Sequence, residues 1–201
     1  MDSQDSRSLP LHSSDDGSLV ARLRSDDARA LGLLMDRYAA ALHRFVRQIV
    51  RRDDLADDVV QDVFVSTWER RKELVITTSV RSYLYRAAKN QALNAIRHES
   101  AEARARSSLI TDVDADGVPV AGGYAQNQGE EAVAAKELDA IVRRALELLQ
   151  PQLREVFLLR RTHGLSYAEI AAALGLQVVT VRSQMSRAVR ALAEAVERGW
   201  G

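Results

Sequence analysis

The chain of 201 residues contains no cysteine, so it can form neither disulfides nor thiolate metal sites. It also has no apolar run long enough to span a bilayer. The Ser- and Asp-rich start has no apolar core of the kind that a signal peptide needs. We therefore expect a cytoplasmic protein without membrane insertion. The 28 basic and 28 acidic side chains balance, so only the distribution of charge can indicate a nucleic-acid partner.

Proline is scarce, with three residues, and no alternating pattern predicts a β-strand. Two regions with helical periodicity, residues 19–98 and 130–201, flank residues 99–129, where aspartate, glycine and proline cluster. We expect an all-α protein of two small helical bundles joined by a flexible acidic linker, after a disordered tail at residues 1–18. The alternative interpretation of the linker is a disordered excursion within one domain.

Apolar residues at steps of three and four predict three helices in the first region. Asp53 and Asp54 can cap the second of these, and residues 74–79 interrupt the periodicity as a loop before the third, at about residues 80–97. The three buried stripes are Leu31, Leu34, Tyr38, Leu42, Phe45 and Ile49; Ala56, Val60, Phe64 and Trp68; and Leu84, Ala88, Ala92 and Ile96. In the second region Ala145 and Leu148 belong to a similar stripe.

The strongest motif runs from Ser166 to about Leu192. Ser166 and Glu169 have the spacing of a capping box that opens a short helix, and Gly175 permits the tight turn of a helix-turn-helix. The helix that follows would bury Val181, Met185, Ala188, Val189 and Leu192, and its other face presents Thr180, Arg182, Ser183, Gln184, Arg187 and Arg190. Such a helix places its first residues in the major groove, where arginine pairs with guanine and glutamine with adenine, and later arginines can reach phosphates. An ordinary helical hairpin with a solvated basic face is the alternative.

The helix at residues 80–97 carries a second candidate site. One ridge consists of Arg81, Tyr85 and Lys89, with Tyr83 nearby; another consists of Arg86, Asn90, Asn94 and Arg97. No acidic residue occurs between residues 77 and 98. Cations that follow phosphates and aromatic rings that stack on bases suit single-stranded DNA. A solvated helix face explains the pattern equally well.

A third candidate is an acidic face in the preceding helix, formed by Asp57, Asp58, Gln61 and Asp62. Favourable placement of acids in a first helical turn explains Asp57. It explains Gln61 and Asp62 less well, because they lie further along the helix, so a protein-binding surface is the second interpretation. The four histidines are scattered and match no metal-ligand spacing. We therefore expect no enzyme, no metal site and no cofactor.

As a set, these segments resemble the extracytoplasmic-function sigma factors of the sigma-70 family. Residues 57–64 resemble the part that docks on RNA polymerase, and residues 82–90 the segment that melts and reads the −10 promoter element. The loop at residues 71–79 corresponds to the one that captures a flipped base. Residues 149–190 resemble the region that reads the −35 element. The resemblance implies a non-catalytic subunit that directs core RNA polymerase to promoter DNA, both duplex and melted.

The resemblance also implies a protein inhibitor, an anti-sigma factor, and gives the linker the role of a connector that passes through the polymerase. Two other classes remain open at this stage. A helix-turn-helix regulator acting without polymerase would need no acidic docking face, and a polymerase pull-down separates it from a sigma factor. A helical adaptor without a DNA role would show no gel shift.

Overall fold

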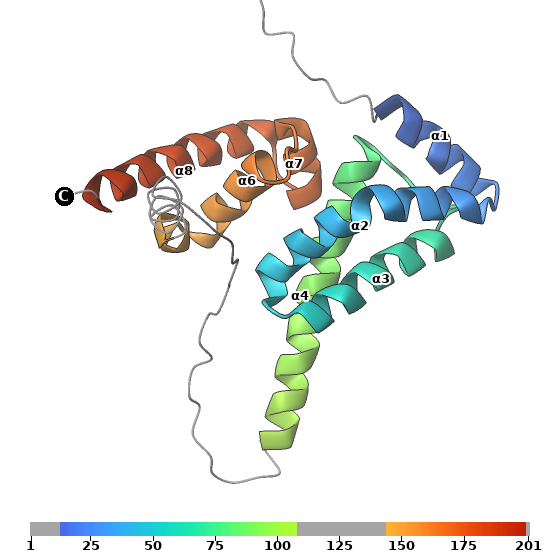
Figure 1. Ribbon diagram of the computed structural model, residues 1–201, viewed down its shortest axis with the longest axis horizontal. Helices are drawn as coiled ribbons and strands as arrows, with labels where there is room; N and C mark the ends of the chain where they lie inside the picture. Colours follow the sequence, from blue (N-terminus) through green and yellow to red (C-terminus); the bar gives the residue numbers. More distant parts are fainter. Residues whose placement is uncertain (1–12, 108–143, 200–201) are drawn as a thin grey trace, which may run out of the picture.

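The computed structural model describes residues 13–107 and 144–199, and these ranges contain helices and no strand. Four helices form the N-terminal domain: α1 (Ser13–Arg24), α2 (Ala28–Val50), α3 (Asp53–Glu69) and α4 (Val80–Ser107). After a short helical stretch at residues 144–148, the C-terminal domain consists of α6 (Pro151–Arg161), α7 (Tyr167–Leu174) and α8 (Val178–Gly199) (Figure 1). The all-α, two-bundle prediction is confirmed.

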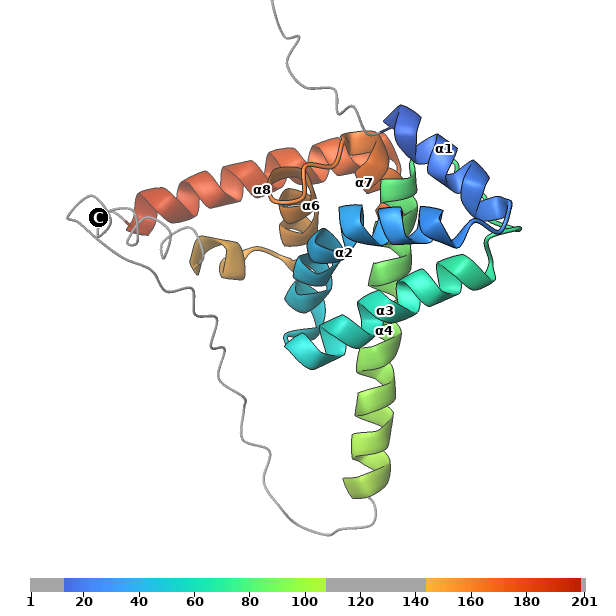
Figure 2. The same ribbon diagram turned by 45° about the vertical axis from the view of Figure 1, so that its right-hand side comes forward.

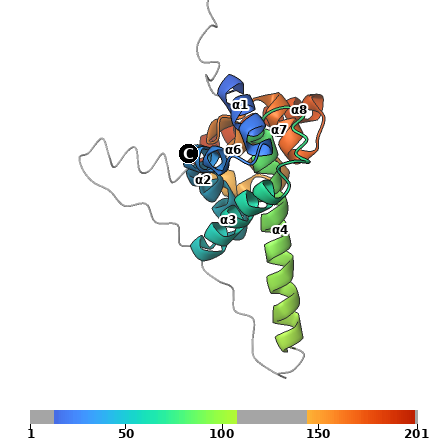
Figure 3. The same cartoon turned by 90° about the vertical axis from the view of Figure 1, so that its right-hand side faces the viewer.

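The N-terminal bundle forms because α2, α3 and α4 turn their predicted apolar stripes toward one another. Leu34, Leu42, Val63, Phe64 and Leu84 are all 1% exposed or less, and burial of each stabilises the fold by roughly 1.5–3 kcal/mol. Asp27 caps α2 by accepting a hydrogen bond from the Arg29 amide at 3.0 Å. The C-terminal half of α4 runs on beyond the bundle, as all three ribbon views show (Figures 1–3).

Helix α1 is an unforeseen part of this bundle. Leu19, Val20 and Leu23 enter the core, and the carboxylate of the buried Asp16 accepts hydrogen bonds from the Tyr38 hydroxyl and the Arg37 guanidinium. The prediction of a disordered tail through residue 18 is therefore wrong from Ser13 onward, because Asp16 and Leu19 both face the core. Residues 1–12 lie outside the described part of the chain.

Three further predictions of extent or burial need correction. Helix α4 continues to Ser107, so residues 99–107 of the expected linker are helical, and the rest of that linker lies outside the described residues. Glu99 supports the extension by pairing with Arg52 at 2.5 Å. Val189 was expected to be buried but is 45% exposed, because α8 packs through the face that carries Met185 and Ala188. Leu148 is likewise 75% exposed, because its helical turn packs through Ala145 and Leu149.

The two domains lie against each other, and helix α7 packs against the N-terminal half of α4. This neighbourhood is visible in two views (Figures 1 and 2). Leu159, Leu165 and Ile170 of the C-terminal domain belong to the same core cluster as Phe45 and Tyr85 of the N-terminal domain. No sequence pattern predicts this contact, since each domain has an amphipathic pattern that could be buried within itself.

Candidate nucleic-acid interface

The helix-turn-helix has the local geometry that its sequence predicts. The Ser166 hydroxyl accepts a hydrogen bond from the Glu169 amide at 3.2 Å, and the Glu169 carboxylate accepts one from the Ser166 amide at 2.9 Å. Gly175 ends α7 with φ of 68°, a left-handed conformation that glycine adopts without steric cost. The turn therefore sets α8 at a fixed angle to α7, with Val181, Met185 and Ala188 packed inward.

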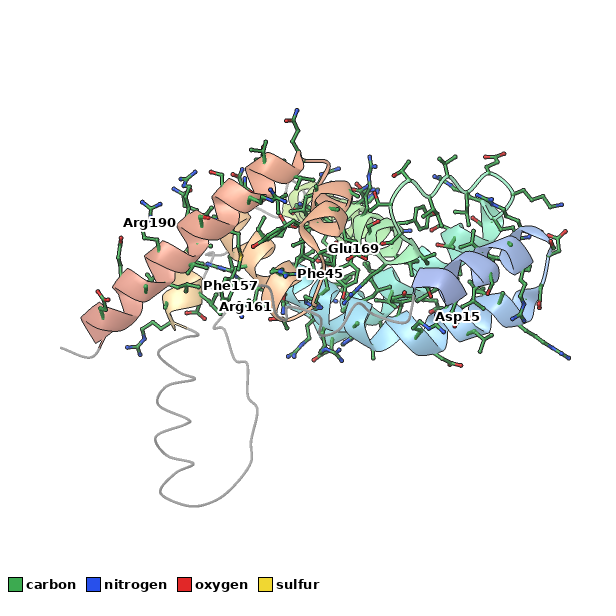
Figure 4. The ribbon with its side chains drawn as sticks, turned by 90° about the horizontal axis from the view of Figure 1, so that it is seen from above. Asp15, Phe45, Phe157, Arg161, Glu169 and Arg190 are labelled. Atoms are coloured by element: carbon green, nitrogen blue, oxygen red, sulfur yellow. The ribbon has the colours of Figure 1, made fainter. Side chains whose placement is uncertain are left out.

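The outer face of α8 is basic and open to solvent. Arg182, Ser183, Arg187 and Arg190 are exposed, and Thr180 and Gln184 are half-buried. Figure 4 shows Arg190 projecting from the outer side of α8, away from α6. Within the described ranges, none of these three arginines takes part in an ion pair. The guanidinium groups can therefore bind an external acceptor without first breaking an internal bond.

The acidic face of α3 is exposed along its whole length, at Asp57, Asp58, Gln61 and Asp62. Asp57 differs from the others because its carboxylate lies 3.2 Å from His43 Nε2 of α2. Asp53 and Asp54, one turn earlier, are paired with Arg47 and Arg52 of the same domain. Asp58, Gln61 and Asp62 thus form the part of this face that is open to a partner.

The two predicted ridges of α4 have different surroundings. Arg86, Asn90 and Asn94 of the second ridge are exposed. The Asn94 side-chain oxygen accepts a hydrogen bond from Arg97 at 2.9 Å. This ridge is therefore an open surface of amides and guanidinium groups, with the residue types that bind DNA bases and phosphates.

The first ridge is covered by the C-terminal domain. The Arg81 guanidinium donates to the backbone carbonyls of His163 and Gly164, which lie in the turn after α6. The Lys89 ammonium lies 2.7 Å from the Glu155 carboxylate, and both side chains are about three-quarters buried. Tyr85, which the sequence placed on an exposed stacking face, is only 1% exposed. The prediction that its ring is free to stack on DNA is wrong for this arrangement, whereas Tyr83 is half-buried.

His163 is the centre of this contact and was not singled out by the sequence analysis. Its ring packs edge-on against Phe45 and Tyr85, with centroid separations of 5.6 and 5.4 Å, and its Nδ1 lies 3.0 Å from the Tyr85 hydroxyl. Burial, followed by the nearby Arg44 and Arg81 guanidinium groups, lowers the pKa of His163 to about 4. Burial also raises the pKa of Tyr85 to about 12. Both rings are therefore neutral at pH 7.

The loop before α4 is anchored at its start by α1 and the turn that follows it. The Arg24 guanidinium donates to the Leu74 carbonyl, and Asp26 pairs with both Arg71 and Lys72. These contacts, led by the hydrogen bond from Arg71, lower the pKa of Asp26. The Arg71 guanidinium also lies 4.2 Å from the centre of the Trp68 ring. Further along, Val75 is 76% exposed, so the loop presents an apolar side chain at the end of a fixed support.

Comparison with known proteins identifies both domains. Residues 34–102 match the family model described as Sigma-70 region 2, and residues 139–192 match Sigma-70, region 4. The ECF RNA polymerase sigma-E factor of Escherichia coli (strain K12) is 32% identical over 183 residues, covering 90% of this chain and 94% of that protein. The RNA polymerase sigma factor CnrH of Cupriavidus metallidurans is 33% identical over 175 residues, covering 86% and 90%.

Solved structures agree with these matches. The structure of CnrH in complex with the cytosolic domain of CnrY has a TM-score of 0.63 and 27% identity, covering 91% of this chain and 97% of that one.

The part of the chain that the structure describes contains no helix long and apolar enough to cross a membrane. The chain belongs to the extracytoplasmic-function sigma factors of the sigma-70 family, which bind RNA polymerase and direct it to promoters.

Proposed function

We propose that this sigma factor works through three separate surfaces and performs no catalysis of its own. The observation that carries the proposal is the exposed arginine face of α8, which follows an intact capped helix-turn-helix. This face reads the duplex −35 element, with Arg182 and Ser183 near the start of the helix facing base edges. Gln184 lies beside them, but its side-chain oxygen is buried. Arg187 and Arg190 contact phosphates.

The second surface is the acidic face of α3, which docks on core polymerase. Asp58, Gln61 and Asp62 carry this contact because all three are exposed, and neither Asp58 nor Asp62 has an ion-pair partner within residues 13–107 and 144–199. Asp57 contributes less, since His43 already lies against its carboxylate. Exposed carboxylates raise the rate of association with a basic partner and fix its orientation.

The third surface is α4 with the loop before it, which acts on the −10 element. Arg86, Asn90 and Asn94 are open to bind the unpaired strand, and Arg81, Tyr83, Tyr85 and Lys89 join them when the C-terminal domain moves away. Stacking on an aromatic ring is worth about 1–3 kcal/mol per base, which offsets part of the cost of opening base pairs. The exposed Val75 suits the loop for contact with a flipped base.

Engagement at two promoter elements and on polymerase makes the complex specific although each contact is weak, because linked sites raise one another's effective concentration. We place the protein in the cytoplasm, where the polymerase works. A protein inhibitor is also part of this proposal, since the related CnrH was solved in complex with the cytosolic domain of CnrY. Such an inhibitor would cover the acidic face, a DNA-binding face, or both.

Run-off transcription with core polymerase on a promoter library tests the function directly. The wild-type chain is expected to select a discrete set of promoters with defined −35 and −10 sequences. Arg86→Ala should reduce open-complex formation, measured by permanganate footprinting, while polymerase binding is kept. Arg29→Ala, which removes an exposed arginine at the start of α2, is the matched control. Equal footprints for Arg86→Ala and wild type would contradict the assignment of α4, and no polymerase-dependent transcript from any promoter would contradict the function.

A further inference from the structure

The start of α8 presents a small group of apolar side chains to solvent. Val179 is 67% exposed, and Leu176 and Val178 beside it are each 37% exposed. A single exposed valine is ordinary, but these three side chains lie together where α7 turns into α8 (Figure 1). Val179 adds little to the packing of its domain, because α8 packs through Val181 and Met185. Its side chain is therefore free to contact a partner.

Val179 shares a helix face with residues proposed above to meet base edges. In an α-helix, residues three, four and seven positions apart lie on one face. Those positions after Val179 are occupied by three exposed residues, Arg182, Ser183 and Ser186. Helical side chains also lean toward the N-terminus of their helix. Val179 thus lies at the leading end of this face, and the leading end of a recognition helix is the part that contacts bases.

The methyl group of thymine is the ligand that fits this side chain. Valine has no donor or acceptor for the polar edge of a base, and thymine is the base that presents a methyl group in the major groove. Valine keeps one preferred rotamer in a helix, so the contact costs little conformational entropy. The surroundings favour DNA over an apolar protein surface, because Arg187 and Arg190 are exposed and no acidic residue occurs between residues 178 and 193.

We propose that Val179 is a specificity-determining residue that reads a thymine methyl group in the −35 element, beside the bases that Arg182 and Ser183 face. The proposal rests on the −35 role proposed above for α8 and adds the identity of one base pair. That pair is T·A, with the thymine methyl turned toward Val179. Removing one methyl group from an apolar contact should weaken binding about fourfold.

Promoter selection by the full chain with core polymerase tests this assignment. From a library with a randomised −35 block, the wild type should select thymine at one position. Val179→Ala should lose that preference and keep the others; the site is exposed and alanine favours a helix more than valine does, so this variant folds. Val189→Ala, the same change at a 45% exposed valine about 15 Å further along the helix axis, is the matched control and should keep the thymine.

Deoxyuridine isolates the contact, because it differs from thymidine only by the missing methyl group. With dU at the selected position, the affinity of the wild-type holoenzyme in gel-shift titrations should fall about fourfold, and that of the Val179→Ala holoenzyme should change little. An equal fall for both proteins would mean that the methyl group acts through the shape of the DNA, which overturns the proposal. A wild-type selection without thymine in the −35 block also overturns it.

The outcomes separate this proposal from the proposed function. If the wild type selects a −35 sequence that Val179→Ala leaves unchanged, the proposal fails and the −35 role of α8 stands. If the wild type selects no −35 sequence, the role of α8 fails and the proposal fails with it. If Val179→Ala weakens binding to core polymerase and lowers transcription from all promoters equally, the valine contacts polymerase, and the assignment to thymine is wrong.

Discussion

Lowering the pH from 7.5 to 5.5 should open the contact between the two domains, because His163 must stay neutral to remain in it. His163 is 5% exposed, and its ring faces Arg44 from α2 together with Arg81 and Tyr85 from α4. Burial and the two guanidinium groups lower the pKa of His163 in the closed form to about 4, from 6.5 for a solvated histidine. Acid therefore protonates the open form first.

The size of the effect follows from the two pKa values. Above pH 6.5 both forms are neutral and the closed form has its full stability. Each unit of pH below 6.5 costs the closed form about 1.4 kcal/mol, until its own pKa is reached. At pH 5.5 the ratio of closed to open molecules should therefore be about tenfold lower than at pH 7.5. Burial raises the pKa of Glu169, but hydrogen bonds from Ser166 and Ser79 together outweigh burial and lower this pKa. The Ser79–Glu169 contact is therefore expected to persist in this range.

Energy transfer between dyes at Glu73→Cys and Ser186→Cys, followed from pH 7.5 to 5.5, measures the ratio. The Glu155→Gln background partly opens the contact and brings a tenfold change into the measurable range. In the Glu155→Gln variant, which keeps His163, the energy transfer should begin to fall near pH 6.5 as the pH is lowered. In the double variant with His163→Gln the transfer should not change with pH, because glutamine does not titrate. If energy transfer depends on pH in the same way with and without His163→Gln, the effect does not come from His163. If energy transfer does not change with pH even when His163 is kept, the reasoning is refuted altogether.

Three other perturbations test separate parts of the molecule. Asp58→Arg or Asp62→Arg should weaken binding to core polymerase, measured by pull-down, while changing the free energy of unfolding by less than about 0.5 kcal/mol; unchanged affinity in both variants would exclude this docking face. If Arg182 reads a base, Arg182→Ala should lose roughly 1–3 kcal/mol of binding free energy on −35 duplexes in gel-shift titrations, with Arg161→Ala as the control. An equal loss on random DNA would instead assign Arg182 to a phosphate contact. Gly175→Ala should destabilise the C-terminal domain by about 1–2 kcal/mol in urea unfolding, because alanine resists φ of 68° even though its Cβ would meet no atom within 4 Å; an unchanged midpoint would show that the turn relaxes.

The helices themselves were predictable because their signals are local. The stripe from Leu34 to Phe45, the capping box of Ser166 and Glu169, and the left-handed Gly175 each involve residues a few positions apart. The ends of helices were predicted less well. Helix α4 extends to Ser107 partly because Arg52, far away in the chain, pairs with Glu99, and no local pattern indicates that interaction.

The candidate surfaces were predictable as residue types on helix faces, but their accessibility was not. Helical spacing alone places Arg81, Tyr85 and Lys89 on one ridge, and this is correct. Whether that ridge meets solvent or another domain depends on a partner surface about 70 residues later in the chain, at Glu155 and His163. A lone histidine next to a glycine carries no sequence signal for such a role. The ring contacts with Phe45 and Tyr85 become evident only in three dimensions.

Helix α1 has a consequence for how the loop before α4 could be altered from a distance. Through Arg24 and Asp26 this region fastens the backbone at Leu74 and the side chains of Arg71 and Lys72. It precedes the segment that matches the Sigma-70 region 2 model, which begins at residue 34. If the loop contacts promoter DNA as proposed, a substitution at Arg24 or Asp26 should shift the loop, and with it the promoter preference, without changing any residue of the loop itself.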